Sequence, residues 1–324
     1  MTKSPFVSLV IVNYNGKDIL NICLPSLEKL NYPKNRYEIM VVDNGSSDGS
    51  IQFLKKKYPK VKVVQNKKNL GYVGINRGLK KCKGEYIYFL NNDLTLEKKC
   101  LYHLVEELQK NENVALAVHK GVNYYNRKLV SGGTWVSRTL YCGHHAPDDN
   151  KQVSEIPYMG SGLIKKSVIT KYGYLFDPDY FIYVEDLDLG LRIRLLGMKT
   201  VMVKKALCYH MDSITMKRFS TPARNTFLLE RNLLITFFKI FSLKTILLLF
   251  PLVIASRIAA IAKDVLRGNV KIAYARIQAI GWVIVHPALI NRKRKATQKA
   301  RKVSDSTVLG IFSEKYIFKK PYLI

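Results

Sequence analysis

The sequence predicts an α/β fold with a mostly parallel central sheet flanked by helices, followed by a helical segment that associates with membranes. Three observations predict it. In residues 1–97, four short apolar runs typical of buried strands alternate with stretches of helical periodicity. A polar turn rich in Asn, Asp, Ser or Gly follows most of these runs. From residue 233 onward, long uncharged apolar runs are interrupted by single Lys and Arg residues.

Size and composition limit the possible classes of protein. A chain of 324 residues can form one large α/β domain with an appendage, or two domains. An apolar content of 48% excludes a disordered chain. With 53 Lys and Arg against 24 Asp and Glu, the net charge of +29 favours anionic partners: nucleic acid, anionic lipid or phosphorylated substrates. Five widely spaced cysteines without a CxxC pair indicate a reducing compartment rather than a disulfide framework or a zinc site.

The four predicted strands are residues 7–12, 37–42, 61–65 and 86–90. The first run is too short for the core of a signal peptide, so we interpret it as a strand. Helices are expected after each of the first three strands, the second of them capped by Ser or Asp from the turn before it. Strands and helices that alternate at this spacing form parallel sheets with right-handed crossovers. The polar turns therefore collect at one edge of the sheet, where such folds bind their ligands.

The next stretch is less regular. A helix is expected over residues 101–108, a strand over 114–118, an irregular segment up to about residue 155, a strand-like piece after Gly162, and a strand over 199–203. His144 and His145 are adjacent and face different ways, so a solvent-exposed loop is the preferred interpretation of this segment. The alternative is that the loop shapes an acceptor pocket.

The expected edge carries side chains suited to a phosphorylated ligand. Asn91, Asn92 and Asp93 end the fourth strand and offer oxygen ligands to a hard cation, although such residues are also common in turns. Asp43 can accept a hydrogen bond from a nucleotide base, or act as a turn residue, and Asn76 lies near glycines that allow close backbone approach. Neither a GxGxxG nor a Walker A sequence is present, which disfavours dinucleotide enzymes and P-loop NTPases.

A second group of acidic residues follows at Glu185, Asp186 and Asp188. Three carboxylates within four positions repel one another, so a fold rarely gathers them without a cation or a proton-transfer role. The alternative is a helix first turn, in which acids complement the macrodipole and Asp188 pairs with Arg192. We assign Asp188 and Arg192 to that alternative and expect Asp186 to be functional. His210 follows a predicted strand and can return to the same edge.

Together these residues resemble the family 2 glycosyltransferases, most closely the rhamnosyltransferase-like branch. The resemblance rests on VSLVIVNYN at residues 7–15, VVDNGSSDGS at 41–50, NLGY at 69–72, FLNND at 89–93, EDLDL at 185–189 and His210, in that order, and it covers residues 5–215. It implies a GT-A fold, which is Rossmann-like, and a nucleotide-diphosphate sugar donor linked to dTDP, UDP or GDP. Rhamnose is suggested by the resemblance alone.

The resemblance also implies roles for single residues. Asn13, Asp43 and Asn76 would contact the base and ribose, and Asp186 would be the general base of an inverting reaction. Asp93 would hold Mg²⁺ or Mn²⁺ against the diphosphate, with His210 as a second ligand. The family's DxD motif has Asn91 in its first acidic position, which should weaken metal binding. The remaining positions assigned to the nucleotide-sugar site are Asn15, Asn69, Gly71 and Asn92, and those assigned to the acceptor side or its support are Gly160, Ser161, Gly162, Glu185, Asp188 and Arg192.

The carboxyl-terminal third differs in composition. Its apolar runs at residues 233–238, 245–256 and 277–291 are each shorter than the roughly 20 residues of a bilayer span, and Pro251 would kink any span through the middle run. We expect interfacial amphipathic helices whose basic residues meet anionic lipid headgroups. Core helices of a second subdomain and a homo-oligomer interface are the alternatives. The basic run at 292–302 is expected to face lipid or solvent, because no nucleic-acid-binding module accompanies it.

The predicted organisation is a catalytic domain at residues 1–220, divided into a nucleotide-binding half at 1–97 and an acceptor half at 98–220. A membrane-associating helical region at 221–303 and a tail at 304–324 follow. The expected function is transfer of a sugar to a lipid-linked or cell-envelope glycan at the cytoplasmic face of the cell membrane. Two alternatives stay open: a processive polysaccharide synthase, which the missing QxxRW sequence weakens, and a catalytically silent nucleotide-sugar-binding or scaffold protein, which Asn91 motivates.

Overall fold

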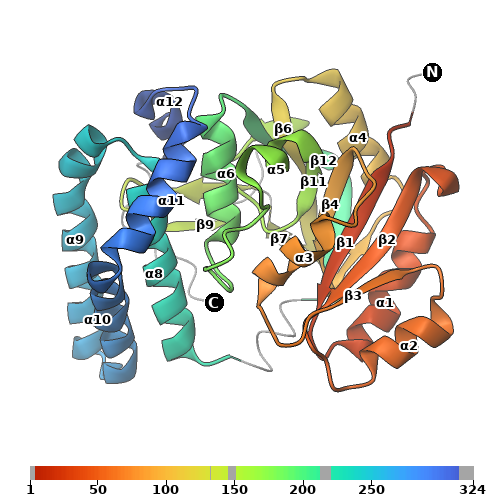
Figure 1. Ribbon diagram of the computed structural model, residues 1–324, viewed down its shortest axis with the longest axis horizontal. Coiled ribbons are helices and arrows are strands. Elements are labelled where there is room, and N and C mark those ends of the chain that lie inside the picture. The colour runs from red at the N-terminus through yellow and green to blue at the C-terminus, as the bar shows by residue number, and fades with distance from the viewer. Residues whose placement is uncertain (1–3, 132, 145–150, 212–219, 314–324) are drawn as a thin grey trace.

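The computed structural model describes residues 4–131, 133–144, 151–211 and 220–313. His145 and Gly132, both in segments considered for the acceptor side, lie outside this part of the chain. In Figure 1 a central sheet occupies one side of the molecule and the carboxyl-terminal helices the other, with one helix of the catalytic region between them.

The first four long strands form the predicted parallel sheet. They are β1 (Val7–Asn13), β2 (Tyr37–Asp43), β3 (Lys62–Gln65) and β4 (Tyr86–Asn91), in the order β4-β1-β2-β3. The connecting helices are α1 (Lys17–Glu28), α2 (Ser50–Lys57) and the short pair η2 (Tyr72–Ile75) and α3 (Asn76–Leu79); the turn η1 (Lys34–Arg36) precedes β2. Parallel pairing places the ends of β1, β2 and β4 at one edge, as predicted.

The second half of the sheet is mixed. Strand β11 (Gly162–Lys165) lies antiparallel between β4 and β6 (Val114–Asn123), and β12 (Lys199–His210) runs parallel to β6. The other elements are β5 (Leu94–Leu96), α4 (Cys100–Lys110), β7 (Leu129–Ser131), β8 (Thr134–Val136), β9 (Cys142–His144), β10 (Val153–Glu155), α5 (Lys166–Tyr172) and α6 (Glu185–Leu195). The expectation of an irregular segment up to residue 155 was therefore wrong, because β7 to β10 lie within it.

Strand β12 is also much longer than the predicted residues 199–203. Its register against β6 shifts between Val203 and Leu207. Pairing resumes after two lysines that interrupt the hydrophobic pattern and so suggest a loop. The extension pairs with β5, so that His210 lies opposite Leu94. This pairing brings His210 next to the end of β4.

The two faces of the sheet pack against different helices. Alternate side chains of β1 and β2 point to opposite faces, so Leu9 and Ile11 pack with α1, α2 and α4, while Val10 and Met40 pack with the other layer. That other layer includes α5, α6 and α8 (Pro222–Ile240), and its buried core extends to Phe237 and Ile240. The hydrophobic core therefore continues across residue 220.

The remaining helices are α9 (Leu243–Leu266), α10 (Val270–Val285), α11 (Pro287–Lys299) and α12 (Asp305–Leu309). By length and composition, α9 could cross a membrane, with a mean hydropathy of 2.2, and α10 with α11 could form a second, bent span. The expectation that every apolar run is too short was therefore wrong for α9, since the helix continues through Arg257 and Lys263. Because Arg257 and Lys263 are charged, the uncharged apolar runs counted in the sequence stop short of the full helix.

The carboxyl-terminal helices include both a core helix and helices with exposed apolar side chains, and both kinds were among the expectations. Helix α8 is a core helix, with Leu233, Phe237 and Ile240 fully buried. Helices α9 and α10 instead expose a set of large apolar side chains that we call the apolar face: Leu243, Leu247, Leu248, Ile258, Val265, Leu266, Val270, Tyr274, Ile277, Ile284 and Val285. Among the described residues of this region, α9 and α10 are therefore the helices whose apolar side chains are available to an outside partner.

Buried ion pairs fasten these helices to the catalytic region. Lys239 of α8 lies 2.8 Å from Asp177 Oδ2 and 2.6 Å from Asp188 Oδ1, with all three side chains fully buried. Lys293 of α11 pairs with Asp177 and, at 2.6 Å, with Asp179. In a second cluster, Glu230 of α8 pairs with Arg257 of α9 and Arg276 of α10.

The basic run is therefore only partly available to lipid or solvent. Besides the Lys293 pairs, Arg294 donates to the carbonyls of Phe238 and Phe241, and Arg301 donates to the carbonyl of Ile240. These carbonyls end helix α8, where they lack intrahelical partners and where cations are favoured. The expectation that the whole run faces outward was wrong, because part of it caps α8.

Candidate active site

The turns after β1 and β2 form one hydrogen-bonded network. Asn13 and Asp43 end paired strands, and Asn13 Nδ2 donates to Asp43 Oδ2 at 3.0 Å. Asp43 also accepts from the Gly45 and Ser46 amides at 3.1 and 2.9 Å and from the Ser46 hydroxyl at 2.6 Å. The Asp43 carboxylate is fully buried and uses its oxygens within the protein. This matches the turn interpretation, and a contact with a base stays a prediction.

Asn15 and Asn92 extend the same network. Asn15 Oδ1 accepts from the Ser47 amide at 2.8 Å, and Asn92 Nδ2 donates to Asn13 Oδ1 at 3.0 Å. Asn92 therefore connects the end of β4 to the end of β1. Gly16 lies against the side chains of Asn13 and Asn92, since a Cβ there would be 2.4 Å from Asn92 Nδ2. The network therefore fixes the side chains at the ends of β1, β2 and β4 relative to one another.

The segment from Asn69 to Asn76 packs on a distant part of the chain. Asn69 Oδ1 accepts from the Gly71 amide at 2.8 Å. Gly71 has a φ of +70°, and a Cβ there would lie 2.2 Å from the carbonyl oxygen of Phe181, so both backbone angle and space require glycine. Asn76 accepts from the Leu175 and Phe176 amides and donates to the Phe176 carbonyl at 2.6 Å. Asn69, Gly71 and Asn76 thus join the nucleotide-binding half to residues 175–181.

Asp93 and His210 lie together. Asp93 Oδ2 is 3.3 Å from His210 Nε2, and the buried Asp93 Oδ1 has no hydrogen-bond partner among the described residues. A carboxylate oxygen without a partner beside an imidazole fits a divalent cation, with other ligands from a diphosphate and water. Among the described residues no group of three or more His, Cys, Asp or Glu side chains surrounds such a position. Asp93 and His210 are thus the two side chains of these types that lie together there in the described part of the chain, and Asn91 supplies no charge.

Asp186 lies in the first turn of α6. The preceding loop is strained, because Phe181, Tyr183 and Val184 have φ values of +67°, +68° and +69°. A β-branched residue rarely adopts this conformation, and each such residue costs on the order of 1–3 kcal/mol. Strain of this kind persists only where the surroundings impose it, and it is common at functional sites. The loop delivers Asp186 into a cavity.

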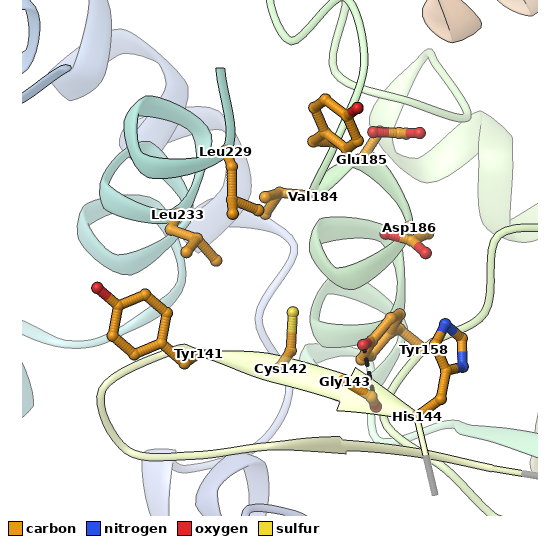
Figure 2. A pocket seen from close by; sticks show the side chains of 11 residues that line it. Tyr141, Cys142, Gly143, His144, Tyr158, Val184, Glu185, Asp186, Leu229 and Leu233 are labelled. Atoms are coloured by element: carbon orange, nitrogen blue, oxygen red, sulfur yellow. Dashed lines mark hydrogen bonds between the residues drawn. The ribbon is translucent and has the colours of Figure 1, made fainter. Parts of the chain in front are cut away.

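Figure 2 shows this cavity, whose volume is about 170 Å³. Asp186 lies on one side, Leu229 and Leu233 of α8 on another, and the hairpin residues Cys142 and His144 along its base. Burial raises the pKa of Asp186 to about 6. His144 therefore contributes to a pocket, so the preferred expectation of a solvent-exposed loop was wrong for this residue and the alternative of a pocket-forming loop applies.

Glu185 is buried next to Asp186, and its Oε2 has no partner among the described residues. Burial, and then the neighbouring Asp186 charge, raise the pKa of Glu185 well above its usual range. The pKa values of both neighbouring carboxyl groups are therefore raised, first of all by burial. Raised carboxyl pKa values in a cavity are typical of acid–base sites.

Several contacts connect this cavity with the Asp93 and His210 pair. The Tyr72 hydroxyl donates to the Gly160 carbonyl at 2.8 Å, and a Cβ at Gly160 would lie 3.7 Å from Asp186 Oδ2. Burial, and then the charges of Glu185, Asp186 and Asp93, raise the pKa of Tyr72. All three acidic groups therefore lie near enough to Tyr72 to affect its pKa.

His119 completes the link. Its Nε2 lies 2.8 Å from the Ser161 hydroxyl. Burial, and then the charge of His210, lower the pKa of His119 to about 3. His119 is therefore neutral and holds Ser161, which follows the glycine beside Asp186.

Of the predicted acceptor-side residues, Glu185 lines the cavity, whereas Gly160, Ser161, Gly162, Asp188 and Arg192 do not. A Cβ at Gly162 would lie 2.7 Å from Val118, so this glycine permits close packing within the sheet. Asp188 and Arg192 are fully buried and pair at 2.7 Å, which confirms the predicted helical pair. Their contacts are with Lys239 of α8 and with Tyr172 and Tyr174, whose rings lie 4.8 Å from the guanidinium carbon.

Several site residues were not predicted: Asn44, Tyr72, His119, Asp177, Asn232 and Lys239. The polar residues on α8 carried a usable signal. Asn232 and Lys239 occur within an otherwise apolar helix, and a polar group in such a stripe requires a buried partner. The identity of that partner, about 50 residues away in the chain for Asn232, cannot be inferred from the pattern.

Comparisons with known proteins agree with this architecture. Residues 8–164 match the family described as glycosyl transferase family 2. A poly(ribitol-phosphate) beta-glucosyltransferase of Bacillus spizizenii is 37% identical over 123 residues, which are 36% of this chain and 19% of the relative. Glycosyltransferase AglE of Haloferax volcanii is 31% identical over 101 residues, 30% of this chain and 33% of the relative. The matched part therefore spans about a fifth to a third of these relatives.

Solved structures resemble the fold over a larger part of the chain. The mannosyltransferase PcManGT from Pyrobaculum calidifontis, in complex with GDP-Man and Mn²⁺, superposes with a TM-score of 0.54 at 16% identity, over 92% of this chain and 86% of that one. Residues 1–349 of S. aureus TarS superpose with a TM-score of 0.53 at 17% identity, over 72% of this chain and 66% of that one. These likenesses concern the fold alone. Residues 8–164 therefore belong to glycosyl transferase family 2, and the chain carries them on a GT-A fold.

Proposed function

We propose that the protein is an inverting, metal-dependent glycosyltransferase that moves a sugar from a nucleotide-diphosphate donor to a lipid-linked or cell-envelope glycan. The observation that carries the proposal is the position of Asp186, a carboxylate with a pKa raised to about 6 inside a cavity. The Asp93 and His210 pair lies next to the end of β4. A base for the acceptor and a holder for the diphosphate are the two components that such transfer needs.

The chain's own residues perform the following steps in this mechanism. Asp186, ionised above pH 6, accepts the proton of an acceptor hydroxyl as that oxygen attacks the anomeric carbon. Attack from the face opposite the leaving diphosphate inverts the anomeric centre and needs a single base. Asp93 and His210 would hold Mg²⁺ or Mn²⁺, which offsets the negative charge on the leaving diphosphate. Tyr72 and Gly160 keep the two halves of the site in register.

The acceptor class follows from the cavity lining. Aromatic residues Tyr141, Tyr158 and Tyr183 suit the apolar faces of sugar rings, and Leu229 and Leu233 suit a lipid portion. The relatives named for poly(ribitol-phosphate) glycosylation support a cell-envelope acceptor. The donor is a UDP, dTDP or GDP sugar, and rhamnose stays a proposal.

We further propose that the apolar face of α9 and α10 lies in the cytoplasmic membrane interface. Lys244, Lys263, Arg267 and Lys271 alternate with its apolar residues, and the net charge is +29. Arg257, in the middle of α9, is fully buried against Glu230 and Tyr141. A spanning α9 would have to leave this partner and carry an unpaired guanidinium into hydrocarbon, so an interfacial position is favoured over a span.

Titration calorimetry with UDP, dTDP and GDP, each with and without Mn²⁺, tests the function first. Metal-dependent binding of one diphosphate would identify the donor class, and transfer from that donor to an isolated lipid-linked glycan would follow. Absence of binding by all three, with and without metal, would overturn the transferase proposal in favour of a scaffold protein. Hydrolysis of the donor without any acceptor-dependent product would also argue against it.

A further inference from the structure

We propose that Asn232 of helix α8 is a positioning residue, which holds the strained loop at residues 179–184 and thereby fixes Asp186; this rests on the proposed role of Asp186 as the base. Asn232 lies outside the stretch matched by the family, on a helix that the sequence assigns to membrane association. Its contacts instead place it behind the active-site loop.

The loop needs such a support. Phe181, Tyr183 and Val184 all adopt the left-handed conformation immediately before α6 begins at Glu185. Because Asp186 is the second residue of that helix, any relaxation of these three backbone angles moves its carboxylate. The loop contributes few hydrogen bonds of its own to resist relaxation: among the described residues, backbone bonds within it run from Tyr180 to Asp177 and from Ile182 to Tyr180.

Asn232 supplies the missing bonds. Its side-chain Nδ2 donates to the carbonyls of Tyr180, Ile182 and Tyr183 at 3.1, 3.0 and 2.8 Å. The side chain is fully buried, and its Oδ1 accepts from Arg231 at 2.9 and 3.0 Å, which fixes the orientation of the amide. One amide thus meets three carbonyls within four residues of a strained turn, with both of its ends occupied.

The opposite side of the loop contacts the nucleotide-binding half. The Phe181 carbonyl accepts from the Val73 amide at 3.4 Å and lies against Gly71. The loop is therefore held between the donor side and α8, and Asn232 supports it from behind. A purely structural asparagine would satisfy a local helix or turn. Among the described residues, the side-chain hydrogen bonds of Asn232 go to this loop and to its neighbour Arg231.

The test compares Asn232→Ala with Thr236→Val, a matched control one turn further along α8. Thr236 is equally buried, and its hydroxyl contacts the Tyr180 phenol at 2.8 Å rather than the loop backbone. We expect kcat of Asn232→Ala to fall about 100-fold, as for a catalytic group displaced by roughly 1 Å, while KM for the donor stays within about threefold. Thr236→Val should keep kcat within about threefold.

Hydrogen exchange measured by mass spectrometry adds a readout that needs no substrate. Amides of residues 181–187 should exchange at least about tenfold faster in Asn232→Ala than in wild type, with α4 unchanged and with no such effect in Thr236→Val. If Asn232→Ala does not fold, Asn232→Ser, which keeps a smaller polar side chain but removes the amide donor, should show the same pattern with smaller amplitude.

The outcomes separate the two proposals. Unchanged kcat and unchanged loop exchange in Asn232→Ala, or equal effects in Thr236→Val, would overturn the positioning role. A wild-type protein that binds no donor and transfers no sugar would overturn the transferase proposal, while faster exchange of the loop in Asn232→Ala would still establish that Asn232 holds it.

Discussion

Asp186 owes its proposed chemistry to its position at the start of α6, where burial raises its pKa and the Leu187 amide donates to it at 2.8 Å. A base in this state is ionised just below neutral pH and is a stronger proton acceptor than an exposed aspartate. Burial, and then the charge of Asp186, raise the pKa of Glu185, one residue earlier, well above its usual range.

Substitution of the base should abolish transfer and spare binding. For Asp186→Asn we expect kcat to fall by at least about 10³-fold, because general-base catalysis contributes roughly 10²–10⁴-fold. Calorimetric affinity for the nucleotide should stay within about threefold, since Asp93 and His210 remain. Glu106→Gln, on the exposed surface of α4, is the control. Transfer close to the wild-type rate in Asp186→Asn would disprove the assignment.

The raised pKa also predicts the pH profile. Asp186 must be deprotonated to accept a proton, so kcat/KM should rise with pH and level off above about pH 6, where the group titrates. An exposed aspartate would place this limb near pH 4. Initial rates between pH 4.5 and 8 at constant ionic strength measure it. A profile flat down to pH 4.5 would show that another group acts.

Asp93 is predicted to make nucleotide binding depend on metal. Removal of its charge in Asp93→Asn should weaken binding in the presence of Mn²⁺ by at least about tenfold and leave metal-free binding nearly unchanged. The reason is that Asp93 is the one carboxylate beside His210 among the described residues. Titration calorimetry with and without Mn²⁺ measures both affinities. Equal losses in the two conditions would mean that Asp93 supports the fold rather than a cation.

At the scale of secondary-structure elements, α6 and α8 are joined by charge as well as by apolar packing. Lys239 lies between Asp177 and Asp188, and Arg192 and Lys293 complete the cluster. Burial alone would raise the pKa of Asp177, but Lys239 and Lys293 hold it well below its usual range. This buried network connects the loop before Asp186 to the carboxyl-terminal helices.

Removal of one partner should destabilise the whole catalytic region. We expect Lys239→Met to lower the free energy of unfolding by about 3 kcal/mol, because it leaves buried carboxylates without their cation. Lys244→Met, on the exposed surface of α9, should change it by less than about 0.5 kcal/mol. Urea unfolding followed by circular dichroism compares them. A loss of similar size in both variants would contradict a special role for the cluster.

The sign of the pH dependence follows from the depressed pKa of Asp177. Its contribution to stability is present above the unfolded pKa, near 4, and is lost as the pH falls through the native value. The wild-type protein should therefore lose stability between pH 5 and 3 more steeply than Lys239→Met. Unfolding midpoints across that range measure the difference, and parallel curves would show that the cluster does not depress the pKa.

These elements show what the sequence could predict. Four strands were predictable because each is a short apolar run that ends in a polar turn, and the Asp93 and His210 pair followed from strand ends at one edge. The length of β12 was hidden by Lys204 and Lys205, which interrupt its pattern. The bond between Asn13 and Asp43 and the partners of Lys239 depend on contacts between distant segments, and periodicity carries no information about them.

At the scale of the molecule, the membrane proposal makes a prediction about the apolar face. Wild-type protein should float with vesicles containing anionic lipid and less with purely zwitterionic ones, and added salt should weaken the association. The double variant Leu247→Glu/Leu248→Glu should remain in the soluble fraction, because both leucines are about three-quarters exposed, at 76% and 75%. Ile22→Glu, at an exposed position on α1, is the control and should float like wild type.

The helices behind that face have a consequence for how the protein can be divided. A polypeptide ended after residue 220 would keep every residue matched by the family and would still lose Asn232 and Lys239. Asp177 and Asp188 would face a void where α8 had been, and the loop before Asp186 would lose its support. Gene fusions, domain exchanges and shortened expression clones should therefore break the chain after α12. The unit that folds includes the carboxyl-terminal helices, although their composition differs from that of the preceding residues.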